Sequence, residues 1–477
     1  MKTIHRIIIC CLVLLSSNSI LGQKSQYIWA FGDSAGIDFN NLSNPQAIES
    51  AMDSRGSCAS ISDSLGNLLF YAGINYYGIG FSTNVYNSLH QQMPNGDSLK
   101  GVAWYNELII LPMPSSANKY YLFTLDLNID KGLYYSVIDM SLNNGLGDVT
   151  TKNHNLNTLW WADEINAIKH ANGRDWWVIC HQMNSNKFYK LLFTPSGLPQ
   201  VSSQYVGVIR RGGGGQVKFS PDGNYLGYTY ELGGFDLFQF DRCTGNLIHM
   251  LNDSLFNNSG FNSGLEFSPN SQFVYVCNSE DIYQYDVTSP NVLSTKTVVA
   301  VYDGYQNPPG FGTFLALPQL APDGKIYITT GNGTFNFHTI DEPDLPGLSC
   351  AVNQHSVQLP AFNFNTIPNH PNYFLGALTG SPCDTLVGVG VNNPEEIKIS
   401  VAPNPITDYF TLSFPVHNDE GTLEVINSLG EIVIQTSVSP WSQFKKLNLR
   451  NFPTGLYFCK MKWKEKQAVA RVMKIEE

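Results

Sequence analysis

The stretch that decides the fold is "FSPDGNYLGYTY", residues 219–230, in which a Pro-Asp-Gly turn separates two largely apolar runs. Proline fixes φ for a tight turn, Asp222 can accept hydrogen bonds from its own backbone, and Gly223 tolerates a positive φ. The phrase therefore predicts a β-hairpin. Similar phrases follow at 267–276 ("FSPNSQFVYV") and 320–329 ("LAPDGKIYIT"), so the hairpin is a repeated element of the scaffold.

Aligning further hairpin candidates on the turn gives a repeat of about 50 residues, a period typical of four-stranded propeller blades. The aligned turn residues are Gly66, Asn118, Gly173, Gly223, Ser271 and Gly324. Six hairpins and the remaining segments predict a β-propeller with WD40-like repeats and seven blades, with six as the alternative. We expect the segments near 27–39 and 356–365 to contribute strands to one blade and so close the ring.

The composition agrees with an all-β protein. Of 477 residues, 14% are charged and 12% are aromatic, while Gly and Pro are frequent, which favours short strands joined by turns. The net charge of −11 argues against nucleic acid as a partner, since phosphate binding needs clustered Lys and Arg.

The first 22 residues have the pattern of a secretory signal peptide: Lys2 and Arg6, an apolar run over 7–15, then small and polar residues. That run is too short to cross a bilayer, and we expect no transmembrane segment. Export permits disulfides. Cys350 and Cys383 lie in loop-like sequence, and we consider them a possible bridged pair.

The propeller is expected over 23–382 and a linker over 383–396, where Gly, Asn and Pro accumulate. Residues 397–477 contain six or seven short alternating runs, which predict a small immunoglobulin-like β-sandwich.

This last segment resembles the type A C-terminal sorting domain of the type IX secretion system. The resemblance rests on three motifs in the family's order, with residues Pro403, Asn404, Pro405, Gly430, Gly455, Tyr457 and Lys474. It implies export across the inner and outer membranes to the cell surface or the medium, with the secretion machinery as a partner. Whether the cargo is anchored or released stays open.

The middle region resembles propeller-type cargo that often precedes such domains, through phrases at 57–71, 132–149 and 170–181. That resemblance implies no activity.

Two places are candidate ligand-binding sites. "LWWADE" brings Trp160, Trp161, Asp163 and Glu164 together before an inner strand, and aromatic rings beside carboxylates suit sugars. The alternative is that the tryptophans pack between blades. Arg210 and Arg211 precede a run of glycines that lacks the Lys-Ser/Thr of a phosphate-binding loop, so we expect the glycines to allow a tight turn and the arginines to line the channel mouth.

The sequence points to a non-enzymatic secreted or surface module that binds a glycan or protein, without cofactor, metal site or catalytic residues. The alternative is a hydrolase or lyase acting on polysaccharide, which needs acids at the starts of inner strands. There the sequence offers only Glu266 and Lys218.

Overall fold

The computed structural model describes residues 24–475, except 76–81, 102–104, 115, 128–130, 160, 211–212, 231–233, 255–262, 309, 385–398, 418 and 465. The proposed signal peptide, Trp160, Arg211 and most of the proposed linker lie outside the described residues. The described residues form strands and three short 3-10 turns, η1 (Asn143–Gly145), η2 (Val292–Thr295) and η3 (Gly347–Cys350). The expected all-β class is confirmed.

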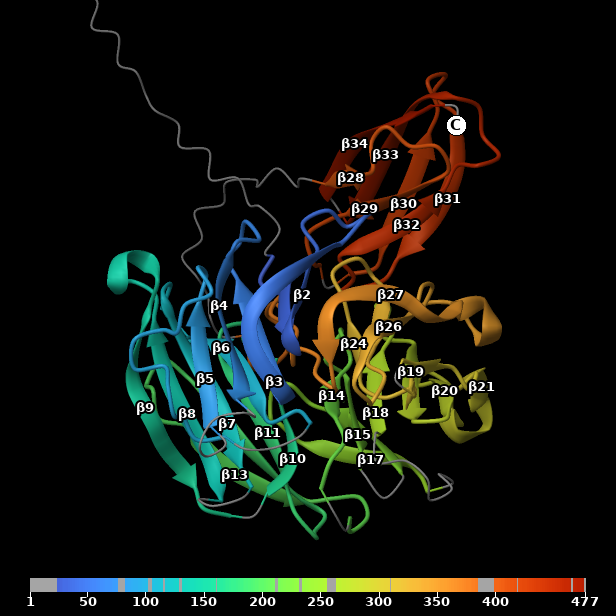
Figure 1. The fold of residues 1–477 in the computed structure, drawn as a ribbon. Helices are drawn as coiled ribbons and strands as arrows, with labels where there is room; N and C mark the ends of the chain where they lie inside the picture. The colour runs from blue at the N-terminus through green and yellow to red at the C-terminus, as the bar shows by residue number, and fades with distance from the viewer. Residues whose placement is uncertain are drawn as a thin grey trace, which may run out of the picture.

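The cargo part is a ring of sheets around one axis (Figure 1). Four-stranded sheets make blades II to VI. Blade II is β6 (Leu108–Pro112), β7 (Lys119–Asp126), β8 (Gly132–Asp139) and β9 (Asp148–Asn157). Blade III is β10 (Trp161–Lys169), β11 (Trp176–Gln182), β12 (Lys187–Phe193) and β13 (Gln200–Tyr205). Blade IV is β14 (Val217–Phe219), β15 (Tyr225–Thr229), β16 (Phe235–Phe240) and β17 (Leu247–Asp253). Blade V is β18 (Ser263–Phe267), β19 (Phe273–Asn278), β20 (Asp281–Asp286) and β21 (Thr297–Val301). Blade VI is β24 (Pro318–Leu320), β25 (Ile326–Ile328), β26 (Thr334–Ile340) and β27 (Val352–Asn363), preceded by a small hairpin of β22 (Gln306–Asn307) and β23 (Phe311–Gly312).

A five-stranded sheet supplies the other two blades, because its long strand β3 (Gln46–Ser62) changes partners along its length. The first half of β3 pairs with β2 (Asp33–Asp38), which pairs with β1 (Ile28–Phe31). Its second half pairs with β4 (Leu68–Asn75), which pairs with β5 (Ser82–Asn87), and these strands form blade I. The described ring thus has seven blades, as expected, and is a β-propeller.

All six predicted hairpins join the inner strand of a blade to its second strand. Gly66, Gly173, Gly223, Ser271 and Gly324 have positive φ, as the turn requires. In the first-quoted phrase the Gly223 amide donates to Ser220 O at 2.8 Å, and Asp222 Oδ1 accepts from the Asn224 amide at 3.0 Å. The repeat is therefore structural, as inferred from the sequence.

Ring closure differs from the expectation. Residues 27–39 form β1 and β2 of the three-stranded blade VII, whereas 356–365 belong largely to β27, the outer strand of blade VI. Blades VI and VII meet by packing of β27 against β2 instead of sharing a sheet.

The channel of the ring is filled by the chain itself. After β27, residues 364–372 run past the inner strands: Thr366 Oγ1 accepts from the Gly32 amide, and the Asn369 amide donates to Cys58 O at 3.0 Å. The Asn369 side chain donates to Leu108 O at 3.0 Å and to Ile165 O at 2.9 Å. One residue thus ties blades I, II and III together.

Leaving the channel, the chain crosses blades III and IV at the end of the ring that carries the hairpins between first and second strands, which we call the hairpin face. Cys383 forms a disulfide with Cys243, between β16 and β17, across a Cα–Cα distance of 5.6 Å. The expected Cys350–Cys383 pair is wrong, because this path carries Cys383 to blade IV while Cys350 lies buried against blade V as a free thiol.

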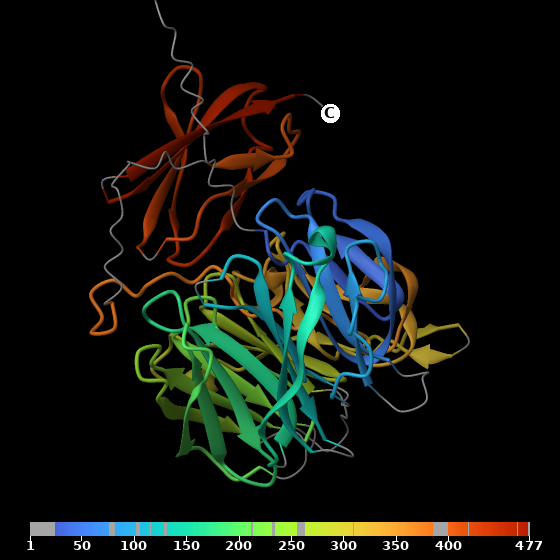
Figure 2. The ribbon, with the colours of Figure 1, turned by 90° about the vertical axis from the view of Figure 1, so that its left-hand side faces the viewer.

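The C-terminal part is a two-sheet sandwich, shown in red in Figure 1. One sheet is β28 (Ser400–Ala402), β29 (Tyr409–Ser413) and β32 (Phe444–Asn448). The other is β31 (Ile432–Val438), β30 (Gly421–Ile426), β33 (Gly455–Trp463) and β34 (Lys466–Lys474). Figure 2 shows the sandwich at one end of the ring.

Candidate functional site

Two groups of buried polar side chains line the axis of the propeller. The first, the Glu164 cluster, consists of Asn106, Glu164, Gln216 and Tyr228 and lies where the inner strands of blades II to IV begin, away from the hairpin face. The second, the channel-mouth group, consists of Lys218, Glu266 and Gln319 and lies toward the hairpin face.

The start of β10 positions the Glu164 cluster. The backbone N–H of Asn106 donates to Asp163 O at 3.2 Å, and the backbone N–H of Ile165 donates to Asn106 O at 2.9 Å. Asn106 and Glu164 therefore lie side by side. In blade IV, the backbone N–H of Gln216 donates to Thr229 Oγ1 at 3.0 Å. The side-chain oxygen Gln216 Oε1 accepts from the backbone N–H of Leu265 at 3.1 Å. These contacts hold the three residues together near the starts of the inner strands.

Several polar atoms of this cluster have no hydrogen-bond partner among the described residues: both Glu164 carboxyl oxygens, both side-chain atoms of Asn106, and Gln216 Nε2. The Tyr228 hydroxyl is close enough to affect the Glu164 pKa, yet its geometry does not make a hydrogen bond to that carboxyl. Instead, Tyr228 Oη lies 3.1 Å from His181 Nδ1.

Burial, and then the charge of Asp163, raises the pKa of Glu164 well above its ordinary value. The pKa of His181 falls to about 3, chiefly because burial disfavours the imidazolium. Burial thus favours the uncharged form at both positions, and in that form the Glu164 carboxyl can donate one hydrogen bond and accept others.

The glycine run passes close over this cluster. A Cβ atom on residue 213 would lie 2.7 Å from Asp163 Oδ1, and a Cβ atom on residue 214 would lie 2.6 Å from the Tyr105 ring. A Cβ atom on residue 215 would lie 2.4 Å from Thr229 O and 3.1 Å from Glu164 Oε1. The described glycines thus allow a close approach and a tight turn into β14, as the sequence suggested.

Other expected ligand-binding residues are held inside the protein. Trp161 is 1% exposed and meets Tyr189 edge to face at 4.9 Å between ring centroids. Arg210 Nε donates to Asp236 Oδ2 at 2.6 Å, and Arg210 Nη1 donates to Tyr230 Oη at 2.7 Å. The structure therefore brings Glu164 into the buried cluster and Asp163 next to Gly213, whereas Trp161 and Arg210 are buried against partners within the protein.

The channel-mouth group is internally paired. Lys218 Nζ donates to Gln319 Oε1 at 2.5 Å and lies 3.8 Å from Glu266 Oε2. Glu266 also accepts from the Phe267 and Leu320 amides. Burial lowers the pKa of Lys218 and raises that of Glu266, and each opposite charge limits the other's shift. These residues line a cavity of about 70 Å³, which has space for a few water molecules.

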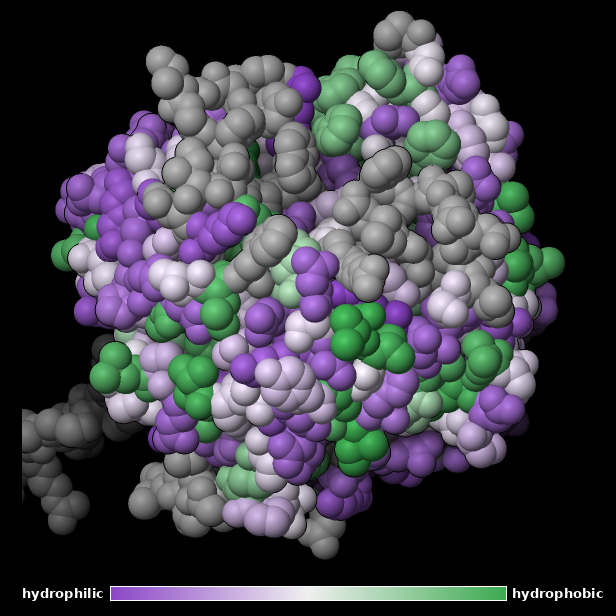
Figure 3. All heavy atoms as spheres, turned by 90° about the horizontal axis from the view of Figure 1, so that it is seen from below, coloured by the Kyte–Doolittle hydropathy of each residue, from purple (hydrophilic) through white to green (hydrophobic). Residues whose placement is uncertain are grey.

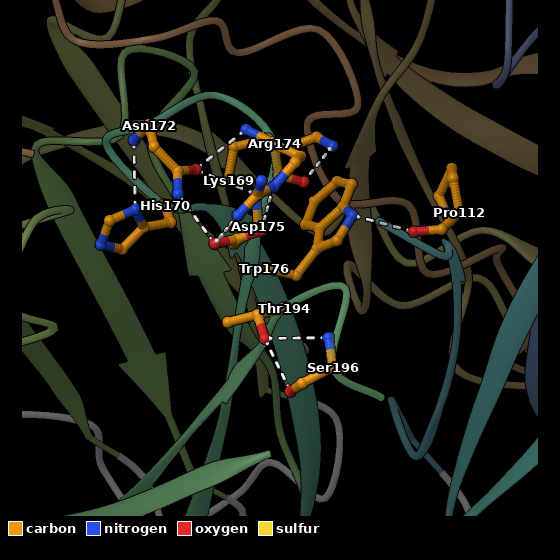
Figure 4. A network of polar contacts seen from close by, with 9 residues as sticks. All are labelled: Pro112, Lys169, His170, Asn172, Arg174, Asp175, Trp176, Thr194 and Ser196. Atoms are coloured by element: carbon orange, nitrogen blue, oxygen red, sulfur yellow. Dashed lines mark hydrogen bonds and ion pairs between the residues drawn. The ribbon is translucent and has the colours of Figure 1, made fainter. Parts of the chain in front are cut away.

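The phrase at 170–181 forms a structural hairpin (Figure 4). Arg174 Nε donates to Asp175 Oδ1 at 2.6 Å and Asn172 Nδ2 donates to Asp175 Oδ2 at 2.8 Å. Trp176 Nε1 donates to Pro112 O at 3.1 Å, joining blades III and II. Its polar groups are therefore used in holding the turn.

Sequence reasoning missed Asn106 and Gln216. It did not consider the start of β6, and at the start of β14 it singled out Lys218 and not Gln216. The signal was a polar residue one or two positions before an inner strand, Asn106 in "NELIILP" and Gln216 in "QVKF". Glu266 and Lys218, the two inner-strand residues the sequence did single out, proved to be partners.

In the sandwich, the motif residues connect its edges. Lys474 Nζ donates to Leu449 O, Arg450 O and Phe452 O at 2.8, 3.0 and 2.6 Å. Asn404 Oδ1 accepts from the Met473 amide and Asn404 Nδ2 donates to Arg471 O. Residues 400–475 match the family model described as secretion system C-terminal sorting domain. The tail is a secretion-system sorting domain. It addresses the protein for export to the cell surface or beyond, and the expected resemblance is confirmed.

No curated protein matches the chain. Solved structures similar to it include a protein provisionally described as a 6-phosphogluconolactonase from Bacteroides uniformis (13% identity, TM-score 0.48), covering 72% of this chain and 98% of that one. Another is the periplasmic gluconolactonase of Pseudomonas aeruginosa (12% identity, TM-score 0.42), covering 72% of this chain and 99% of that one. A third is the β-propeller domain of Cps50 from Myceliophteria thermophila (8% identity, TM-score 0.38), covering 65% and 94%.

Within the described residues, no helix is long and apolar enough to span a membrane. Nor do three potential metal-binding side chains come together in that part of the chain.

Proposed function

We propose that this protein is an exported, non-enzymatic propeller that binds a hydroxyl-rich ligand, a glycan, through the Glu164 cluster. The observation that carries the proposal is the set of buried polar atoms on Asn106, Glu164 and Gln216 that have no partner in the described chain. A buried polar group left without a hydrogen bond costs about 1–3 kcal/mol, so a ligand that supplies the bonds is strongly favoured.

The chemistry of the cluster favours an uncharged ligand. Amide groups and a protonated carboxyl each both donate and accept, which matches the hydroxyl groups of a sugar. A charged ligand would find no opposite charge on these three side chains and would pay for its own desolvation. The aromatic ring of Tyr105, beside Gly214, adds an apolar surface of the kind on which sugar rings stack.

The position of the Glu164 cluster at one end of the ring also supports binding of an external ligand. The sorting domain lies against the opposite end, and the described residues seen from below form a mainly hydrophilic surface with separate apolar spots (Figure 3).

A hydrolase or lyase acting on polysaccharide is the second candidate, and one observation favours it. A carboxyl kept protonated by burial, next to Asp163, has the properties of a general acid with a second carboxylate at hand. The two functions differ in what Glu164 must do. Binding needs its hydrogen bonds, whereas catalysis needs its proton to leave.

Binding of the purified full chain to a panel of neutral and acidic glycans, with turnover assayed on the same panel, tests the proposal. We expect Asn106→Leu to weaken binding about ten-fold or more, since the ligand loses both partners of one amide. Glu164→Gln keeps the shape and a neutral donor, so binding should stay within about three-fold of wild type. Asn353→Ala, an exposed amide on β27, is the control. Turnover by the wild type that Glu164→Gln abolishes would establish the enzyme instead, and unchanged binding by Asn106→Leu would reject the site.

A further inference from the structure

The segment 441–446 of the sorting domain, between β31 and the first residues of β32, lies on the hairpin face of the propeller. Trp441 is 7% exposed and belongs to the same apolar cluster as Phe240 and Leu375 of the propeller. The Arg242 guanidinium lies 5.5 Å from the Trp441 ring centroid, within the range of a cation–π contact. An aromatic residue of one domain is thus buried in the other.

Phe444 makes a second contact, which depends on a glycine. Its ring lies over the hairpin turn of blade VI, where a Cβ on Gly324 would come within 2.2 Å of Phe444 Cε2. Gly324 has φ +85°, so the turn itself also favours glycine. The same residue that shapes the hairpin leaves room for the sorting domain.

Charges of opposite sign meet at the edge of this contact. Lys446 Nζ lies 2.6 Å from Glu342 Oε1, with both side chains partly exposed. Lys445 is near Asp344, whose pKa burial raises to about 6 although Lys445 lowers it. The propeller thus offers acidic residues where the segment carries lysines.

The docked segment also forms one wall of the cavity at the channel mouth. Lys218, Glu266 and Gln319 line it from the propeller, and Trp441, Ser442 and Phe444 line it from the sorting domain. The charged pair of the channel mouth is covered by the tail.

We infer that the hairpin face is a docking surface for an aromatic and basic segment, and that its occupant is residues 441–446 of the same chain. The sorting domain is then held against the propeller and covers the channel mouth. Individually these contacts are modest, because the ion pair is exposed and worth about 0–1 kcal/mol. The covalent connection between the domains makes docking intramolecular, and an effective concentration in the millimolar range suffices for weak contacts to hold.

A cysteine reporter in the full chain tests this inference. Ser442→Cys introduces a thiol of nearly the same size into the contact, where Ser442 is 8% exposed. Its rate of maleimide labelling is read at residue 442 by peptide mass spectrometry. The described free cysteines are all buried, so the reporter is distinguished by position and by rate.

In the reporter background we expect Lys446→Glu to raise the labelling rate at least three-fold and Phe444→Ser at least ten-fold. Glu342→Lys alone should act like Lys446→Glu, and the pair of reversals together should restore slow labelling. Lys464→Glu changes the same charge at a site that pairs with Asp419 inside the sandwich, and should have no effect.

Thermal unfolding followed by circular dichroism shows whether Phe444→Ser still folds. If it does not, the charge reversals alone decide. Fast labelling in the parent reporter, or reversals that neither accelerate labelling nor restore it when combined, would overturn the inference.

Discussion

Replacing Glu266 by glutamine should destabilise the propeller far more than its single charge suggests. Lys218 and Glu266 are 3% and 5% exposed at the side chain and lie 3.8 Å apart. Removing one partner of a buried pair leaves an ammonium group without a counter-charge, which costs about 3–5 kcal/mol. Gln319 still accepts from Lys218, which favours the lower end of that range. Glutamine can replace only one of the two oxygens that accept from the Phe267 and Leu320 amides, which adds about 1 kcal/mol. We expect a loss of about 4 kcal/mol at pH 7.

The loss should depend on pH in a defined direction. Burial lowers the pKa of Lys218, and without Glu266 it falls further. Between that lowered pKa and the unfolded value of about 10.4, the unfolded chain binds more protons than the folded chain, so the variant gains stability as pH rises. The deficit relative to wild type should therefore be smaller at pH 9.5 than at pH 7. Urea unfolding of the full chain, followed by circular dichroism at both pH values, measures it.

Two further variants make the reasoning testable. Lys218→Met combined with Glu266→Leu removes both charges and should recover most of the loss, because an apolar pair of similar volume is often neutral. Lys325→Gln, which breaks the more exposed pair with Asp341, should cost less than about 1 kcal/mol. The reasoning would be refuted if the unfolding free energy of Glu266→Gln were within about 1 kcal/mol of wild type, or if the double variant were less stable than Glu266→Gln.

Three other perturbations should have the following results. Cys243→Ser should lower the stability of the propeller by about 5 kcal/mol in the chain-entropy model, because the disulfide closes a loop with a sequence separation of 140; unfolding with and without reductant measures this, and equal midpoints for wild type under both conditions would contradict it. The stability of Glu164→Gln relative to wild type should increase as pH rises above the unfolded pKa of about 4.3, by about 1.4 kcal/mol per pH unit until the raised folded pKa is reached, because the folded wild type holds a proton that the unfolded chain releases; a stability difference between the two proteins that does not change with pH would count against a raised pKa of Glu164. Lys474→Met should weaken the sandwich by about 2–4 kcal/mol by leaving three carbonyls without their donor, and should lower the exported fraction of the protein, whereas the exposed Lys464→Met should do neither.

The repeating hairpins were predictable because a turn is a local structure. The Pro-Asp-Gly phrases specify φ at Gly223 and Gly324 and supply side-chain acceptors within four residues, so no distant contact was needed to recognise them. The sandwich was predictable from its short alternating runs and from its motif, whose residues Asn404 and Lys474 make contacts within the sandwich itself.

The disulfide, the channel segment and the Glu164 cluster depend on how distant segments come together. The position of Cys383 against Cys243 follows from the path of residues 364–382, which no periodicity describes. Asn106, Glu164 and Gln216 come from three blades, and each alone looks like an ordinary polar residue near the start of a strand. What makes them a site is that they are buried together without partners, and burial is a property of the assembled ring.

The filled channel limits where such a ring can act. In an open propeller, a ligand could enter from either end and meet all the inner strands. Here Asn369 occupies the axis and already satisfies carbonyls of blades II and III, so a ligand that displaced it would have to replace both bonds. We therefore expect the proposed ligand at one of the two ends, which differ in chemistry. At the hairpin face the charged pair is satisfied and covered by the sorting domain, whereas beyond Asn369 the side-chain amide groups of Asn106 and Gln216 and the Glu164 carboxyl have polar atoms without a partner in the described chain. The end that lacks hydrogen-bond partners is the end where an external ligand has most to contribute.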